Sequence, residues 1–221
     1  MSPKKFKIFP YGIKLNEVKP RRSPEDIRTE FGWQGKFIIG TAARIDPLKR
    51  LEYLIEGFYN LRKKDDCLLV IMGTGNKNYE IYLKNLVKNY NLQNYVQFLG
   101  YRNDVYDILN TLNIFVLPSP KEPFGLALLE AMSLGIPSIV FADGGGAVDI
   151  LGDGGIIVNS VEELARAIER LKEDSELRER LSKNVKERAR LFDISFTAEN
   201  LYNIYYELLS AQPLDFKFNY N

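Results

Sequence analysis

The sequence contains no histidine and a single cysteine, Cys67, among its 221 residues. The absence of histidine removes the commonest general base and the commonest metal ligand, so any catalysis must use other groups. One cysteine permits neither an internal disulfide nor a cysteine metal cluster, which agrees with a reducing compartment such as the cytoplasm. Because an apolar run follows it at 68–70, we expect Cys67 to lie in a buried strand.

Long apolar runs and a charge imbalance are also missing. No apolar run approaches the roughly 18 residues that a transmembrane helix needs, and residues 1–7 lack the apolar core of a signal peptide. Thirty basic against 29 acidic residues leave a net charge of +1, so neither nucleic acid nor an acidic membrane is expected as a main partner. With 45% apolar residues, the chain can bury a full core, and we expect a soluble globular protein.

Apolar runs of strand length alternate with segments of helical period. Most of the runs are apolar throughout, which is typical of parallel strands covered on both faces. We therefore expect an α/β fold with a doubly wound, Rossmann-like parallel sheet. The strands are predicted at 37–43, 67–72, 95–99, 114–117, 137–141 and 155–158, and the helices near 51–63, 78–90, 103–110, 125–134, 146–151, 161–172, 175–191 and 195–210.

Three parts of the chain are expected. Residues 1–35 carry several prolines and glycines and should form a hinge, a linker and an irregular cover, whereas 36–191 should form the Rossmann-like domain. Residues 192–221 should form a C-terminal helix and tail. Ser195 is the expected cap of that helix, and an apolar stripe on it predicts that it docks on another surface; the stripe comprises Leu201, Ile204, Tyr205 and Leu208.

Loops that follow parallel strands are where open α/β sheets bind ligands. Four such loops are rich in cations or glycines: 43–50 with Arg44 and Lys49, 73–75, 118–125, and 143–147. Together they predict a site for a phosphorylated ligand, with amide donors, close backbone approach and two cations. Each feature also has a structural alternative, since the cations could be ordinary surface charges and the glycines at 73–75 and 144–146 simple turns.

Glu130 is the only charged residue between Glu122 and Asp143. Its helix should be buried, because the neighbouring residues are Leu126, Leu128, Leu129, Met132 and Leu134. An unpaired carboxylate in such a place is costly or becomes protonated. We therefore expect a partner, which is either an internal salt bridge or a polyol such as ribose, whose vicinal hydroxyls can donate two hydrogen bonds to one carboxylate.

Glu122 and Glu130 enclose seven residues that include a Phe-Gly-Leu helix start. This pattern resembles the signature of the retaining GT-B glycosyltransferases of the glycogen synthase, sucrose synthase and bacterial mannosyltransferase group. Further segments resemble that family in the same order: GTAARIDPLKR, MGTGN, VQFLGYRNDVYDIL, IFVLPSPKEPFGLALLEAMSLGIPSIV, GGGAVDIL and GIIVNSVEELARAI. The resemblance runs from about residue 8 to about residue 209 and implies the C-terminal lobe of a GT-B fold.

The resemblance implies that Arg44, Lys49 and Glu122 are catalytic residues. Arg44 and Lys49 would hold the diphosphate of the donor without a metal or another cofactor, and Glu122 would face the hydroxyls of the transferred sugar. Glu130 would accept the ribose hydroxyls. The backbone amides at 124–126 would close on sugar and phosphate, and the implied substrate-binding residues are Gly73, Thr74, Tyr101, Arg102, Phe124, Gly125, Leu126 and Gly145.

The implied activity is the transfer of a hexosyl group from a UDP-, ADP- or GDP-sugar to a hydroxyl acceptor, with retention of configuration. In the family a Pro-x-Gly hinge follows an N-terminal acceptor lobe, and only nine residues precede Pro10–Gly12. We therefore expect a lone donor lobe that transfers no sugar by itself. It should be located in the cytoplasm and contact a membrane only through the missing lobe, toward which residues 192–221 would pack. Two alternatives stay open: a non-catalytic nucleotide-sugar binding module and half of a GT-B sugar-nucleotide epimerase.

The sequence departs from the family pattern at three positions. Arg50 stands where a glycine usually follows the lysine, Tyr11 replaces the asparagine of the hinge, and Asp149 stands where glutamate is common.

Overall fold

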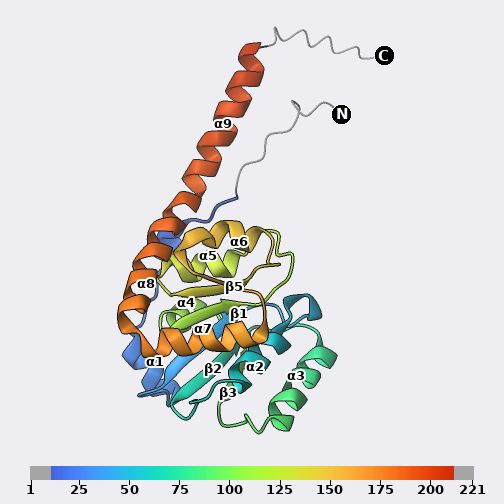
Figure 1. Ribbon diagram of the computed structural model, residues 1–221. Helices are drawn as coiled ribbons and strands as arrows, with labels where there is room; N and C mark the ends of the chain where they lie inside the picture. The colour runs from blue at the N-terminus through green and yellow to red at the C-terminus, as the bar shows by residue number, and fades with distance from the viewer. Residues whose placement is uncertain (1–10, 212–221) are drawn as a thin grey trace.

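The structure, a computed structural model, describes residues 11–211. Its centre is a six-stranded parallel sheet in the order β3-β2-β1-β4-β5-β6 (Figure 1). The strands are β1 (Phe37–Ala42), β2 (Cys67–Met72), β3 (Val96–Gly100), β4 (Ile114–Leu117), β5 (Ser138–Phe141) and β6 (Ile156–Val158). The parallel α/β sheet is confirmed, and each predicted strand boundary lies within one residue of the observed one.

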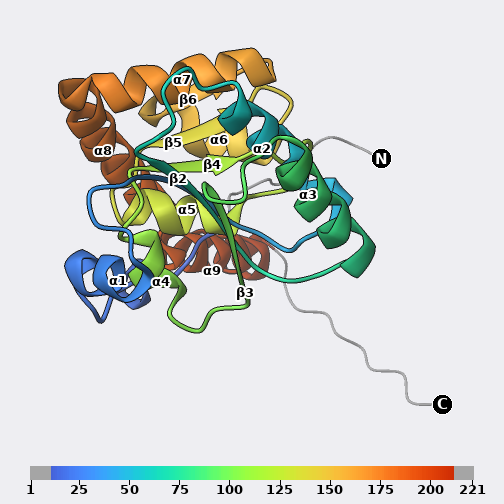
Figure 2. The ribbon, with the colours of Figure 1, turned by 90° about the horizontal axis from the view of Figure 1, so that it is seen from below.

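Helices cover both faces of the sheet. One face carries α2 (Leu51–Tyr59), α3 (Lys77–Asn89) and α7 (Val161–Glu173), and the other α1 (Pro24–Phe31), α4 (Val105–Leu109), α5 (Leu126–Ser133) and α6 (Gly146–Leu151), while α8 (Ser175–Ala189) contributes to both cores. Figure 2 shows α2, α3 and α7 opposite α1, α4 and α5. Alternate side chains of a strand point to opposite faces of the sheet. Because helices cover both faces, every residue of β2 is buried, Cys67 included. Helix α2 ends at Tyr59, four residues before its predicted end.

The expected irregular cover over residues 1–35 contains a helix that belongs to the core. Ser23 caps α1 by accepting a hydrogen bond from the Asp26 amide at 3.1 Å, and the helix ends at Gly32 in the left-handed conformation. The side chains of Ile27 and Trp33 are fully buried. The prediction of an irregular segment was therefore wrong for residues 24–31, since α1 closes one end of the hydrophobic core.

The last helix, α9 (Ile194–Ala211), extends away from the body (Figure 1). Asp193, rather than Ser195 as predicted, provides the cap, because its Oδ1 accepts hydrogen bonds from the Ser195 amide at 2.9 Å and from Oγ at 2.6 Å. Tyr205 and Leu208 of the predicted stripe are 58% and 59% exposed. Within residues 11–211 little packs on that stripe, so its docking stays a prediction.

Gly12 of the expected hinge lies beside the start of α9, whereas Pro10 lies outside the described residues. Ile13 and Asp193 form a parallel backbone bridge, in which the Ile13 amide donates to the Phe192 carbonyl at 3.1 Å and the Ile194 amide donates to the Ile13 carbonyl at 2.9 Å. The segment that enters the domain and the one that leaves it are therefore joined at one place.

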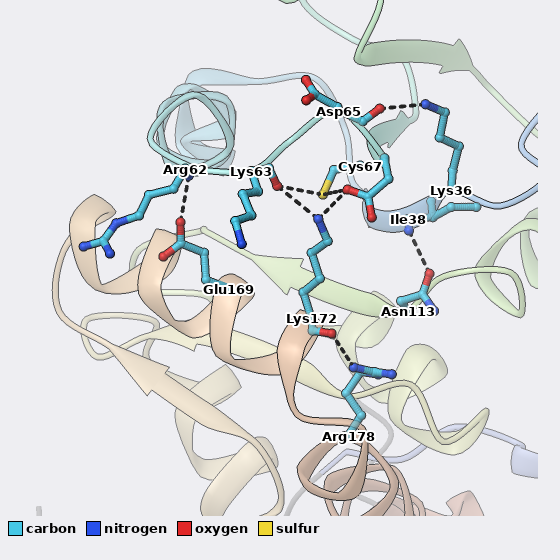
Figure 3. Close-up of polar contacts among 11 residues, drawn as sticks. Lys36, Ile38, Arg62, Lys63, Asp65, Cys67, Asn113, Glu169, Lys172 and Arg178 are labelled. Carbon is cyan, nitrogen blue, oxygen red and sulfur yellow. Dashed lines mark hydrogen bonds and ion pairs between the residues drawn. The ribbon is translucent and has the colours of Figure 1, made fainter.

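Polar side chains join the elements at the edge of the sheet where the strands begin (Figure 3). Lys172 of α7 donates to the Lys63 carbonyl at 3.1 Å and pairs with Asp66, directly before β2. The thiol of Cys67 lies beside these groups, and burial raises its pKa, so it is a structural cysteine rather than a reactive one. The pairing with Lys172 lowers the pKa of Asp66.

Arg28 of α1 forms a second polar contact at the same edge. Its guanidinium donates to the carbonyls of Lys36 and Thr111, each at 2.8 Å, and to Asn113 Oδ1 at 3.3 Å. Asn113 Oδ1 also accepts a hydrogen bond from the Ile38 amide at 2.7 Å (Figure 3). This arginine therefore satisfies the backbone carbonyls of the segments that lead into β1 and β4.

Candidate functional site

The site lies at the opposite edge of the sheet, at the point where the order of the strands reverses. β1 and β4 are neighbours, but the chain continues from β1 to β2 on one side and from β4 to β5 on the other. A crevice for ligands forms at such a switch point. Lys49 follows β1 and Glu122 follows β4, and their Nζ and Oε2 atoms are 2.6 Å apart, with 24% and 12% of the side chains exposed. The structure thus brings two of the three predicted catalytic residues together.

The loops after β1 and β2 are paired through their backbones. Ile45 forms a parallel bridge with Gly75, its amide donates to the Thr74 carbonyl at 3.0 Å, and its carbonyl accepts from the Asn76 amide at 2.7 Å. A Cβ atom at Gly73 would lie 1.9 Å from the Ala43 carbonyl oxygen. Gly73 and Thr74 therefore support the cation-bearing loop in this structure, and Gly73 is required for the close backbone approach.

The loops after β4 and β5 are paired in the same way. The Glu122 amide donates to the Gly144 carbonyl at 3.1 Å, and the Glu122 carbonyl accepts from the Gly146 amide at 2.8 Å. Gly145 lies between them with a φ of 60° and bridges Glu122. The glycine run is therefore an ordered support for the loop that carries Glu122, rather than a flexible turn.

Helix α5 begins directly behind Glu122. Gly125 is its N-cap with a φ of 97°, and no side chain caps it among residues 11–211. A Cβ atom at Gly125 would lie 3.6 Å from Glu122 Cγ. The amides of the first turn have no partner inside the helix, and the helix dipole is positive at this end, so the position is suited to an anion. The predicted amides at 124–126 lie here, and the Phe124 ring contacts Tyr11 edge-on at 5.9 Å.

Arg44 lies at the rim of this crevice. Its side chain is 65% exposed, and its Nη2 is 3.4 Å from Asp46 Oδ2. The structure therefore leaves Arg44 accessible to a ligand without placing it against Lys49 or Glu122.

Glu130 lies on the one uncovered stripe of α5. Leu126, four residues earlier, is 48% exposed, which corrects the expectation that this helix is buried all round. The partner of Glu130 is Tyr106, whose hydroxyl donates to Oε1 at 3.1 Å, and no lysine or arginine among residues 11–211 pairs with it. Burial raises the pKa of Glu130, and the hydrogen bond from Tyr106 lowers it less. Burial and the nearby carboxylate raise the pKa of Tyr106 to about 12. The internal salt bridge is thus absent, and the carboxylate keeps acceptor capacity.

Tyr106 also lines a groove of about 1320 Å³ beside Tyr101 and Arg102. Arg102 forms two hydrogen bonds to Asp104, at 2.8 and 2.7 Å, which lower the pKa of that carboxyl. Tyr101 is 75% exposed. The predicted base-side residues therefore lie together, and Tyr106 connects their groove to Glu130 of α5.

The opposite wall of the groove was missed from the sequence. It consists of residues in the 16–22 segment, and the Arg21 and Arg22 amides fix it by donating to Asp107 Oδ1 at 2.5 and 3.1 Å. The two consecutive arginines mark a basic loop. Only the fold shows that this loop lies over the end of β3.

Residues 11–211 contain neither a cluster of metal-ligating side chains nor a helix suited to span a membrane. No group of three or more histidine, cysteine, aspartate or glutamate side chains in this range is arranged to hold a metal ion. None of the helices in the same range has the combination of length and hydrophobicity that a transmembrane span requires.

Comparisons with known proteins identify relatives of this chain. The chain is 31% identical over 200 residues to N-acetyl-alpha-D-glucosaminyl L-malate synthase of Bacillus anthracis, covering 86% of this chain and 50% of that protein. It is 29% identical over 189 residues to UDP-Gal:alpha-D-GlcNAc-diphosphoundecaprenol alpha-1,3-galactosyltransferase of Escherichia coli, covering 80% of this chain and 48% of that protein. The chain thus spans about half the length of the curated relatives it matches.

A solved structure shows the same fold. Anabaena HepE, in complex with UDP and glucose and in complex with UDP-glucose, has a TM-score of 0.81 at 24% identity, covering 91% of this chain and 56% of that chain. The family model described as Glycosyl transferases group 1 matches residues 23–188, including both sides of the crevice. This match spans most of the chain, and we conclude that the chain belongs to the Glycosyl transferases group 1 family.

Proposed function

We propose that this chain binds a nucleoside diphosphate sugar and forms the donor side of a retaining glycosyltransferase that transfers a hexosyl group to a hydroxyl. The observation that carries the proposal is the Lys49–Glu122 pair, 2.6 Å apart at the switch point of the sheet and beside the N-terminus of α5. A cation, a carboxylate and free helix amides at one point provide contacts for a phosphate and for sugar hydroxyls at the same time.

The proposed chemistry uses these groups directly. Cleavage of the sugar–phosphate bond builds negative charge on the leaving diphosphate, and Lys49, the accessible Arg44 and the amides of α5 would stabilise that charge. Glu122 would exchange its bond to Lys49 for bonds to the hydroxyls of the transferred sugar. Neither a histidine nor a metal is required for this step, and retention of configuration rests on the family resemblance.

Glu130 and the groove would hold the nucleoside. Glu130 lies four residues after the first residue of α5, which is about 6 Å along the helix axis. A ribose bound there would place its hydroxyls at the carboxylate while its diphosphate reaches the helix N-terminus. Tyr101 and Arg102 would then border the base. UDP is the nucleotide to test first, because the name of the E. coli relative and the complexes of HepE contain it.

The acceptor would be held by a second lobe. Every site residue described above lies on the donor side, and the apolar stripe of α9 has the exposure of a surface that packs against another domain. We propose that this lobe completes the enzyme, that the chain alone transfers no sugar, and that the reaction takes place in the cytoplasm. Among the relatives named above are a synthase and a transferase, and neither is an epimerase.

Titration calorimetry tests the donor assignment. The chain should bind UDP, GDP or ADP, with a preference for one base, and the corresponding nucleoside more weakly, and EDTA should leave both affinities unchanged. Sugar transfer should be detectable only when the chain is joined to an acceptor lobe. If none of the nucleoside diphosphates binds at millimolar concentration, the proposal is wrong.

A further inference from the structure

Arg50 directly follows Lys49 and has an unusual backbone conformation. Its φ of 51° and ψ of 42° place it in the left-handed region, which residues with a Cβ atom rarely adopt. Helix α2 starts at the next residue. The conformation therefore sets the direction in which the chain enters α2, and interactions of the side chain must support it.

The Arg50 guanidinium forms hydrogen bonds along its edges and contacts aromatic rings on its faces. Nε donates to the Pro118 carbonyl at 3.0 Å, and the two Nη atoms donate to the two carboxylate oxygens of Asp143 at 2.8 and 2.7 Å. The guanidinium carbon is 4.5 Å from the centre of the Tyr53 ring and 4.9 Å from that of Phe141. With 15% of the side chain exposed, Arg50 is fixed in one position.

These contacts, which we call the Arg50 bridge, cross the switch point. Pro118 belongs to the loop after β4 that carries Glu122, and Asp143 belongs to the loop after β5. The backbone carbonyl of Asp143 also accepts a hydrogen bond from the Lys121 amide at 2.7 Å. The pair of Lys49 and Glu122 crosses the same gap. It has a single hydrogen bond, however, and under the proposed function both partners exchange it for contacts with the donor.

We propose that Arg50 is a positioning residue, which holds the Lys49 loop against the loops after β4 and β5 when Lys49 leaves Glu122 for the diphosphate of the donor. This inference rests on the proposed function. The Arg50 bridge keeps all of its partners when a donor binds, because the three nitrogens of the guanidinium already have protein acceptors and aromatic rings lie near it. Lys49, by contrast, is free to reorient on its flexible stem.

Arg50→Gly is the sharpest variant, because glycine adopts the same positive φ without strain and only the side chain is removed. Asp143→Asn removes the charge of the partner at nearly constant shape. Asp66→Asn is the matched control, since it breaks an ion pair of the same kind at the opposite edge of the sheet. For each chain we would measure thermal unfolding, the affinity for UDP by calorimetry, and the affinity for uridine by competition.

The expected result is a selective loss of diphosphate binding. Arg50→Gly should weaken UDP binding about tenfold, which is about 1.4 kcal/mol, and leave uridine binding within about twofold. Asp143→Asn should act in the same direction, and the double variant should be no weaker than Arg50→Gly alone, because both changes break one bridge. Asp66→Asn should leave both affinities unchanged.

Three outcomes would overturn the inference, and they differ in what they mean. Unchanged affinities with a lower melting temperature would show that Arg50 only stabilises the fold. A loss in Arg50→Gly without a loss in Asp143→Asn, or with a gain there, would show that Arg50 binds the phosphate itself. Failure of the unmodified chain to bind any nucleoside diphosphate would refute the proposed function and this inference with it.

Discussion

Replacement of Glu130 by glutamine separates a nucleotide-binding carboxylate from a structural one. Glutamine keeps the shape of the side chain and one acceptor oxygen, so Tyr106 can still donate its hydrogen bond. What is lost is the charge. Hydrogen bonds to charged groups contribute about 1.5 to 3 kcal/mol and neutral ones about 0.5 to 1.5. For the two ribose hydroxyls the loss should be about 2 to 3 kcal/mol, or about 30- to 150-fold in affinity.

The stability of the free chain should change in the opposite direction. Burial raises the pKa of Glu130 in the folded state, so its contribution to stability is present below the unfolded pKa and is lost as pH rises through the folded pKa. At neutral pH the buried carboxylate therefore lowers the stability of the folded chain, and glutamine removes this destabilising charge. Glu130→Gln should unfold at the same temperature as the unmodified chain or at a higher one. Nucleotide affinity of the unmodified chain should fall as pH falls through the raised pKa, and that dependence should flatten in Glu130→Gln.

Calorimetric titration with UDP and thermal unfolding at several pH values provide the two measurements. Tyr106→Phe is the comparison variant, since it removes the hydrogen bond that the Glu130 side chain accepts within residues 11–211. Because Tyr106 also lines the groove proposed for the nucleoside, a loss of UDP affinity is expected, and it should be smaller than that in Glu130→Gln, which removes the charge itself. Unchanged UDP affinity in Glu130→Gln together with lower stability would refute the ribose assignment and leave Glu130 as a partner of Tyr106 only.

Three further predictions follow from other parts of the molecule. Lys49→Ala should weaken UDP binding by about 1.5 to 3 kcal/mol and uridine binding much less, with a smaller effect for the more exposed Arg44→Ala and no effect of EDTA; a strong magnesium requirement would contradict this. Arg28→Ala should leave the carbonyls before β1 and β4 unsatisfied and lower the free energy of unfolding by about 2 to 3 kcal/mol. Denaturation followed by the fluorescence of Trp33, the only tryptophan, measures this loss, and the folded variant should keep its UDP affinity. The chain alone should transfer no sugar from a panel of donors, and α9 should show weak protection in hydrogen exchange; turnover similar to that of a two-lobed enzyme would refute the first part.

The sheet could be predicted from the sequence because six apolar runs stand between polar loops, and a strand buried on both faces needs such a run. Helix α1 was missed because only two of its apolar residues, Ile27 and Phe31, contact the core. Two apolar residues are too few to show the helical repeat of 3.6 residues in the sequence. Its boundaries were nevertheless readable. Ser23 before Pro24 is a cap followed by a preferred first residue, and Gly32 is the usual end.

The residues of the site could be predicted in part, and their pairing could not. Lys49 and Glu122 are 73 residues apart in the sequence. Only the order of the strands in the sheet shows that the loops carrying them meet. The partner of Glu130 was equally hidden, since Tyr106 belongs to a short helix that the sequence connects to β3 and β4 rather than to α5. The left-handed conformation of Arg50 is likewise not readable from spacing along the chain, and its one signal is that the family resemblance has a glycine at this position.

The position of the polar contacts at both ends of the strands has a practical consequence for engineering. Cys67 and Met72 mark the two ends of β2, and five steps of a parallel strand separate them by about 16 Å. Substitutions farther apart than about 7 to 10 Å usually have additive effects on stability. Extra stability introduced around Lys172 and Arg28 should therefore carry over unchanged to variants at the crevice. A reinforced background of this kind would let even severe losses of binding be measured on a chain that is fully folded.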